Sequence, residues 1–82
     1  MRIIGHLPHP FLKITVFSLN MKFAVKFEAG LMDQTYKFRE SENLKSLSDI
    51  EKLVDETFVN EVIESFKTMN NTLNHSFKRS FS

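Results

Sequence analysis

Cysteine and tryptophan are absent from this 82-residue chain, and glycine and proline occur only twice each. The lack of cysteine excludes a thiol nucleophile, a dithiol redox pair, a thiolate zinc site and any disulfide. No apolar run approaches the ~20 residues of a membrane-spanning helix. Gly5, Pro8 and Pro10 also interrupt the N-terminal residues before the apolar core of a signal peptide can form. We therefore expect a cytoplasmic protein with no membrane contact.

The composition is nevertheless that of a folded domain. Hydrophobic residues make up 41% of the chain, nine of them are Phe, and the formal net charge is only +1. A domain this short buries about 60% of its unfolded surface, and without disulfides oligomerisation is the common remaining support. The sequence therefore predicts one small domain over residues 1–82, and we expect it to form a homodimer.

Alternation of apolar and polar residues predicts three strands within residues 11–39. The first runs about 11–17, and the other two centre on Val25 and Tyr36. Short connections make the three an antiparallel meander, because parallel strands need long crossovers. Residues 1–10 are expected to be an extended lead-in. The expected core positions are Leu12, Ile14, Val16, Phe23, Val25, Phe27, Tyr36 and Phe38 on the strands and Ile50, Val54, Phe58, Val62 and Phe66 on the helix.

A helical segment is predicted over residues 46–77, followed by a frayed tail at 78–82. Ser46 with Asp49, and Ser48 with Glu51, are spaced as capping boxes, and the apolar positions recur every three or four residues. An unbroken helix of this length would span about 45 Å, against about 23 Å for seven-residue strands. Either the helix breaks near Thr57, which would cap a second helix, or its far end packs on another subunit or frays. We expect a break together with a partner.

The predicted fold class is thus α+β, a three-stranded antiparallel meander followed by one long or broken C-terminal helix packed on one sheet face. Charge is unevenly distributed along it. Residues 1–39 carry a net charge of +4, residues 40–64 carry −6, and residues 65–82 carry +3 with no acidic residue. Opposite charges on separate segments favour an interface in which the basic sheet of one subunit meets the acidic helix of another.

The outward face of the predicted sheet is basic and partly aromatic. Single-stranded nucleic acids bind such faces, where cations follow the phosphates and rings stack on bases. The same charges are also explained by a solvated face with guarded edges, or by a subunit interface with an acidic helix. The residues of this possible nucleic-acid or partner face are Lys13, Phe17, Lys22, Lys26, Lys37 and Arg39.

The apolar stripe near the C-terminus provides the candidate dimer contacts. Met and Phe at helical spacing usually indicate core, yet this stripe continues past the expected end of the sheet. We expect it to be the second half of a dimer core, although it also suits docking of another helix. The candidate contacts are Phe66, Met69, Leu73 and Phe77.

Residues suited to catalysis or metal binding are few. His6 and His9 would need an acid such as Glu28 or Asp33 to complete a metal site, and we expect them to be surface histidines of the lead-in. The helix carboxylates stand beside no nucleophile motif, Gly-rich loop or calcium loop. We therefore expect no enzyme, no metal and no cofactor.

The run Leu7 to Phe17, together with Lys26-Phe27-Glu28 and Gln34 to Phe38, resembles short uncharacterised bacterial proteins. That resemblance implies one compact domain of bacterial type and no particular function. A meander followed by a helix is also topologically similar to the single-stranded-DNA-binding coactivator and Pur-type folds, whose repeats have four strands. The expected function is non-enzymatic binding to a protein or a second copy, with weak single-stranded nucleic-acid binding as the alternative.

Overall fold

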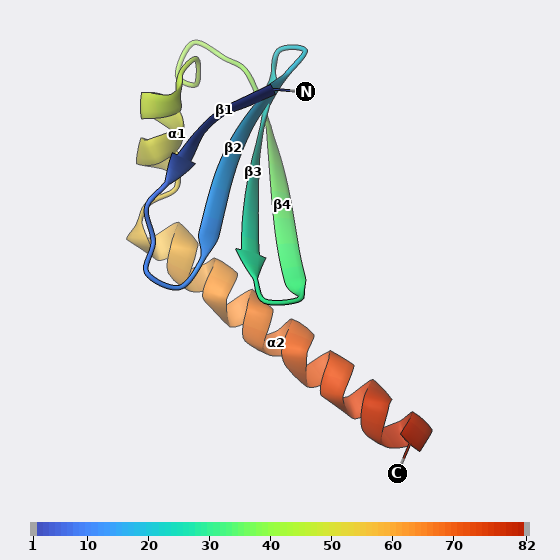
Figure 1. The fold of residues 1–82 in the computed structure, drawn as a ribbon. Helices are drawn as coiled ribbons and strands as arrows, with labels where there is room; N and C mark the ends of the chain where they lie inside the picture. Colours follow the sequence, from blue (N-terminus) through green and yellow to red (C-terminus); the bar gives the residue numbers. More distant parts are fainter. Residues whose placement is uncertain (1, 82) are drawn as a thin grey trace.

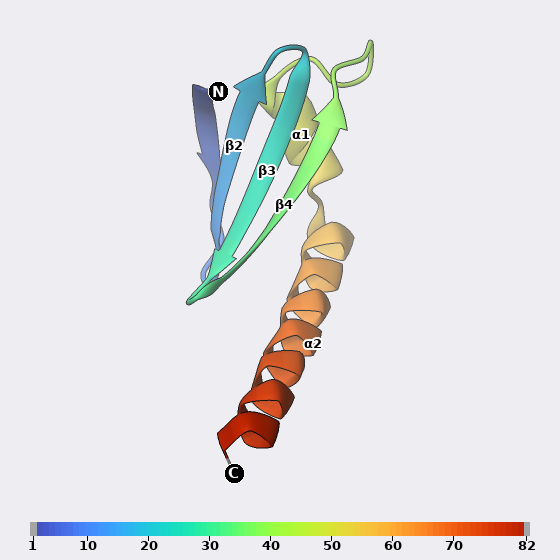
Figure 2. The ribbon, with the colours of Figure 1, turned by 90° about the vertical axis from the view of Figure 1, so that its right-hand side faces the viewer.

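The computed structural model describes residues 2–81, which form an antiparallel four-stranded sheet followed by two helices (Figure 1). The strand order in the sheet is that of the sequence, and both helices lie on one side of the sheet (Figure 2). This confirms the α+β class and the antiparallel meander. The elements are β1 (Arg2–Leu7), β2 (Lys13–Leu19), β3 (Lys22–Ala29), β4 (Met32–Arg39), α1 (Leu47–Leu53) and α2 (Glu56–Phe81).

The prediction of three strands was wrong, because the expected lead-in contains β1. This strand pairs antiparallel with β2, and its register shifts between Ile3 and Gly5. The shift is a bulge, which breaks the alternation of apolar and polar residues by which the other strands were predicted. Gly5 adds a second reason, since glycine is unfavourable in strands. Met1, the first residue of the expected lead-in, lies outside the described residues.

Two-residue turns join β2 to β3 and β3 to β4. Asn20 and Met21 in the first turn have φ of 42° and 63°, and positive values at both positions are those of a type I′ hairpin. Gly30, the first residue of the second turn, has a φ of 62°. Both turns match the right-handed twist of the strands and fix the pairing register.

The core lies between one face of the sheet and the helices, as predicted. Phe27, Val16, Val25 and Ile50 are fully buried. The ring of Phe58 from α2 stacks on Phe27 with centroids 5.8 Å apart. Tyr36 and Phe38 pack partly buried around the same cluster. The alternating strand positions and the helix stripe therefore meet in one apolar layer.

The predicted helix break is present, but its cap differs from the expected one. The first helix ends at Leu53, and α2 begins at Glu56. The carboxylate of Asp55 accepts a hydrogen bond from the N–H of Phe58 at 2.9 Å, which is the bond of an N-cap residue. Asp55 therefore caps α2, and Thr57 lies inside its first turn. The bend lets Ile50 and Val62 both reach the core.

Beyond the sheet, α2 continues as an exposed helix. Its 26 residues span about 39 Å at 1.5 Å per residue, and the molecule is elongated, with extents of 52 × 25 × 18 Å. In Figures 1 and 2 its C-terminal half projects past the turn between β3 and β4. The frayed tail expected at 78–82 is instead helical through Phe81, and residue 82 lies outside the described residues.

Candidate binding surfaces

The strand register places all five predicted cations on the sheet face that points away from the helices. Cross-strand partners share a face, and the register aligns Phe17 with Ala24 and Lys37, and Leu19 with Lys22 and Arg39. The six predicted residues therefore lie on one face of the sheet. We call it the basic sheet face, formed by Lys13, Phe17, Lys22, Lys26, Lys37 and Arg39.

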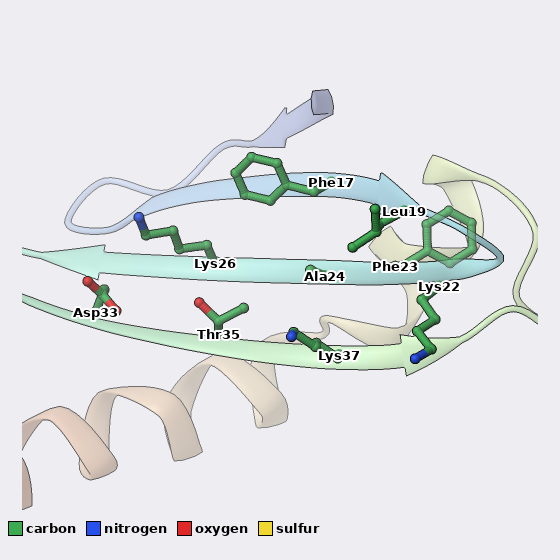
Figure 3. A pocket seen from close by; sticks show the side chains of 9 residues that line it. All are labelled: Phe17, Leu19, Lys22, Phe23, Ala24, Lys26, Asp33, Thr35 and Lys37. Atoms are coloured by element: carbon green, nitrogen blue, oxygen red, sulfur yellow. The ribbon is translucent and has the colours of Figure 1, made fainter. Parts of the chain in front are cut away.

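A shallow hollow of about 360 Å³ lies on this face (Figure 3). The half-buried ring of Phe17 stands at one side, Ala24 forms part of the floor, and Lys22, Lys26 and Lys37 border it. An apolar floor with a ring and cationic borders suits an anionic ligand that also carries a flat apolar group.

The charge on the basic sheet face is not uniform. Glu28 and Asp33 share the face near the turn between β3 and β4, where they pair with each other across the two strands. The amine of Lys26 lies 3.8 Å from the Glu28 carboxylate. Lys22, Lys37 and Arg39 gather toward the opposite end. An anion is therefore attracted most strongly at the end near Met21.

Sequence reasoning missed the contributions of β1 and of Leu19 to this surface. Ile3 pairs with Phe17 and His6 with Thr15, so both extend the face by one strand. The Nδ1 of His6 lies 3.3 Å from the Thr15 hydroxyl. The β-branched pair Ile3-Ile4 was the available signal for a strand, but Gly5 and the bulge obscured it.

A second surface follows the apolar stripe of α2 past the end of the sheet. Val62 and Phe66 are buried against the sheet, so Phe66, one of the predicted dimer contacts, already lies in the core of its own chain. Farther along, exposure rises to 37% at Met69, 57% at Leu73, 65% at Phe77 and 76% at Phe81. We call these last residues, Met69, Leu73, Phe77 and Phe81, the distal stripe.

An open hollow of about 500 Å³ lies where α2 leaves the sheet. Its walls come from α2, from the connection between β1 and β2, and from the strand ends that flank the turn between β3 and β4. Most of them are apolar, and Phe11 in this region is strongly exposed. We call it the end hollow, lined by Phe11, Leu12, Ala29, Met32, Ile63, Phe66, Lys67 and Asn70.

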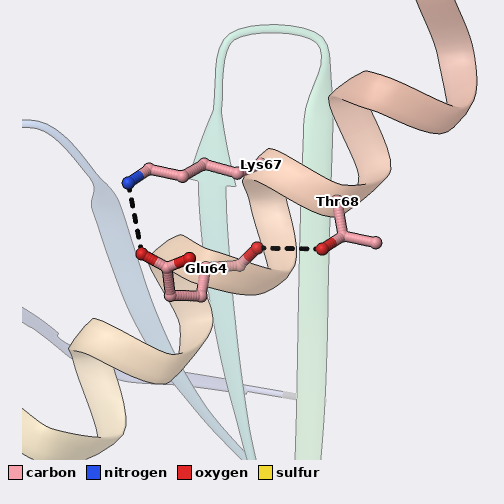
Figure 4. A network of polar contacts seen from close by, with 3 residues as sticks. All are labelled: Glu64, Lys67 and Thr68. Carbon is pink, nitrogen blue, oxygen red and sulfur yellow. Dashed lines mark hydrogen bonds and ion pairs between the residues drawn. The ribbon is translucent and has the colours of Figure 1, made fainter.

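On the sheet-facing side of α2, the Gln34 amide donates to the Val62 carbonyl at 3.1 Å, and further polar contacts lie on its exposed side. The amine of Lys67 and the carboxylate of Glu64 are 3.1 Å apart, and the Thr68 hydroxyl donates to the Glu64 carbonyl at 3.3 Å (Figure 4). Both groups of the ion pair are well exposed, and exposed pairs contribute little to stability.

The structure does not bring the histidines into a metal site. His9 Nδ1 accepts the N–H groups of Phe11 and Leu12, both at 3.1 Å, which rigidifies the connection after β1. Residues 2–81 contain no cluster of three or more histidine and carboxylate ligands. In the same part of the chain, no helix is both long and apolar enough to cross a membrane.

The carboxyl group of Asp49 has a lowered pKa, and this group caps the start of α1. The backbone N–H of Lys45 donates to the Asp49 carboxylate at 2.9 Å, with further contacts from Ser46. These bonds hold the pKa of Asp49 below its ordinary value of 3.8. The same hydrogen bonds stabilise the start of α1 by favouring the ionised carboxylate.

Comparison with protein-family models, curated proteins and solved structures finds no match for this chain.

Proposed function

We propose that the chain is a small non-enzymatic binding domain that acts as a homodimer joined through α2. The observation that carries this proposal is the distal stripe, where exposure increases along a helix whose apolar periodicity does not end with the sheet. Large contiguous apolar surfaces on small proteins are commonly interaction sites. The small size of the chain and its lack of disulfides also favour a dimer, because association enlarges a hydrophobic core that is small in a single chain.

The matched pair Leu73→Asp and Asn71→Asp tests the proposal. Both substitutions introduce one carboxylate on the same turn of α2, but only Leu73 belongs to the distal stripe. Sedimentation velocity at micromolar to millimolar concentrations should give twice the 9.6 kDa chain mass for the wild type and Asn71→Asp. Leu73→Asp should raise the dimer dissociation constant at least about tenfold. A wild-type monomer over the whole range would contradict the proposal.

A second candidate function, single-stranded nucleic-acid binding, is favoured by the basic sheet face. The support is the register, which gathers five cations around Phe17 and the hollow beside it. The presence of β1 also removes the difference in strand number from the single-stranded-DNA-binding coactivator and Pur-type folds, an analogy of topology alone. Neutralising about 3–5 phosphates on a single strand gives a logarithmic salt slope of roughly −2 to −3.5.

Fluorescence anisotropy with a labelled mixed-sequence oligonucleotide tests this candidate. Lys22→Glu/Lys26→Glu reverses two cations on the face, whereas Lys45→Glu/Lys52→Glu makes the same charge change outside it. Only the first pair should abolish binding, and wild-type affinity should fall with salt at the stated slope. Equal titration curves for the two variants would remove this function and leave the homodimeric binding domain.

A further inference from the structure

Three features of α2 determine how two copies would pair: its charge distribution, the polar residue Asn70 within its apolar stripe, and the end hollow beside it. We propose that two copies pair antiparallel through α2, crossing near Asn70, so that Phe77 of each copy enters the end hollow of the other. This inference rests on the proposed self-association and adds its orientation and register.

Charge selects the antiparallel orientation. The chain has no acidic residue after Glu64, whereas Lys67, Lys78 and Arg79 follow it. The part of α2 that lies on the sheet instead carries Glu56, Glu61 and Glu64. A parallel pair would place the basic ends of two helices side by side. An antiparallel pair places each basic end beside the acidic half of the other helix, which is favourable and suppresses the alternative.

Asn70 fixes where the helices cross. It is four residues after the buried Phe66 and three before Leu73, so it lies on the same side of α2 as the apolar stripe. It also lines the end hollow. A single Asn within an apolar helix interface costs stability unless it meets a hydrogen-bonding partner, and it thereby specifies register. Crossing at this residue lets the two Asn70 side chains bond each other.

A crossing at Asn70 places Phe77 beside the end hollow of the partner subunit. In an antiparallel pair centred on Asn70, the residue seven positions after the centre lies opposite the residue seven positions before it. Phe77 therefore comes opposite Ile63 of the partner subunit. In each chain Ile63 lines the end hollow, whose volume of about 500 Å³ accommodates a phenyl ring. In a two-fold symmetric dimer this contact occurs twice, because the Phe77 ring of each subunit fills the end hollow of the other.

Distances between spin labels test the orientation, and the absence of cysteine makes single labels unambiguous. Asn71→Cys is one residue from the crossing and Ser80→Cys is ten residues from it. At 1.5 Å per residue, the antiparallel pair separates the two labels along the helix axes by about 3 Å at position 71 and about 30 Å at position 80. A parallel pair gives short separations at both.

The outcomes separate this inference from the proposed self-association. A short distance at 71 with a long one at 80 supports the antiparallel pair. Short distances at both positions would overturn the orientation while leaving the dimer in place. Absence of any dipolar coupling in either labelled protein, with a monomeric mass, would overturn both proposals. Circular dichroism of each labelled protein confirms that α2 remains folded.

Charge reversal provides an independent test that needs no label. Lys78→Glu/Arg79→Glu puts acids opposite acids in the antiparallel pair, and we expect the dissociation constant to rise about tenfold at low salt. Adding Glu61→Lys/Glu64→Lys to the same chain should restore most of the affinity. In a parallel pair, Lys78→Glu/Arg79→Glu would replace repulsion between two basic helix ends by repulsion between two acidic ones, and the dissociation constant would not change. An unchanged dissociation constant would therefore contradict the antiparallel proposal.

Discussion

Phe27 is the fully buried member of the aromatic cluster in the core. Its side chain is fully buried, and the rings of Tyr36 and Phe58 lie 5.8 Å from it. Removing a buried phenyl group loses transfer energy and leaves a cavity. We expect Phe27→Ala to lower the free energy of unfolding by about 3–5 kcal/mol, most of the stability of a small domain.

Urea denaturation measures this change, with Lys26→Ala as the control on the opposite sheet face. Lys26 is partly exposed and makes a long ion pair, so its truncation should cost less than about 1 kcal/mol. Equal losses for the two variants would mean that the strand faces are inverted.

Met21 is the residue whose backbone least suits its side chain. Its φ of 63° is in the left-handed region and its side chain is 74% exposed. An L-residue loses about 1–2 kcal/mol in this conformation, whereas glycine adopts it freely and costs somewhat more entropy on folding. Met21→Gly creates the Asn-Gly pair preferred in type I′ turns and should stabilise the protein by about 0.5–1 kcal/mol in urea denaturation.

The control is Leu31→Gly in the neighbouring hairpin. Leu31 is fully exposed and, unlike Met21, does not have a positive φ, so glycine there adds only flexibility to the unfolded chain. We expect Leu31→Gly to be neutral or destabilising. A gain of the same size in both turns would disprove the conformational explanation.

Asp49 links the stability of α1 to pH. Hydrogen bonds, chiefly from the Lys45 N–H, lower the pKa of its carboxyl group in the folded protein. A lowered folded pKa stabilises the protein at pH values above the unfolded pKa, and this contribution disappears as pH falls through the folded pKa. Asp49→Asn should therefore be less stable than the wild type at neutral pH, with the difference shrinking below pH 3.8. Thermal denaturation at several pH values measures the stability difference between the two proteins. A difference that does not change with pH would exclude the lowered pKa of Asp49 as its cause.

At the scale of the elements, β1 packs closely against α1 at Gly5. A Cβ placed on Gly5 would lie 2.6 Å from Cδ2 of Leu47 at the start of α1. The Leu47 side chain would have to move, and overpacking of this kind costs about 1–3 kcal/mol. We expect Gly5→Ala to destabilise the protein by about 1 kcal/mol, because the obstacle is the end of a flexible side chain.

A double-mutant cycle with Leu47→Ala identifies the contact. Once the Leu47 side chain is truncated, Gly5→Ala should cost clearly less than in the wild type, with an interaction energy above about 0.5 kcal/mol. Strictly additive losses in urea denaturation would show that Gly5 is required for its backbone alone.

Elements with regular periodicity were predictable from the sequence. Leu12 to Val16 and Phe23 to Phe27 alternate cleanly because each strand has one face on the core, and the helix stripe repeats because α2 does the same. The strand β1 was not predictable by that rule, since its bulge moves neighbouring residues to unexpected faces. The cap of α2 was misassigned to Thr57 because sequence spacing does not tell which polar residue has the extended backbone of an N-cap.

The candidate surfaces were predictable to different degrees. The five cations of the basic sheet face follow from strand alternation, which fixes the face once the register is known. The end hollow was not foreseen, because it joins Phe11 and Met32 to α2, and contacts between distant segments leave no periodic signal. Phe66 was assigned to the dimer because the stripe alone does not show where the sheet stops covering it.

At the scale of the whole molecule, self-association should appear as stability that depends on concentration. If the folded dimer is the stable species, each tenfold rise in protein concentration adds about 0.7 kcal/mol per chain, half of the 1.4 kcal/mol per dimer. The denaturation midpoint should then rise by about 3–5 °C per tenfold. Scanning calorimetry measures it, with Leu73→Asp expected to show no such rise. A constant wild-type midpoint would contradict the dimer.

The order of the strands also bears on how fast the chain folds. Each strand pairs with its neighbour in sequence, and the two-residue turns on either side of β3 make two of the three pairings local. Local contacts close small loops at low entropic cost, and chains rich in them fold quickly. The exceptions are the contacts of the two helices with the sheet, among them that between Gly5 in β1 and Leu47 in α1, which lie about forty residues apart. We expect the hairpins to form early and the docking of α1 on β1 to complete the domain, so that Gly5→Ala raises the unfolding rate more than it slows folding.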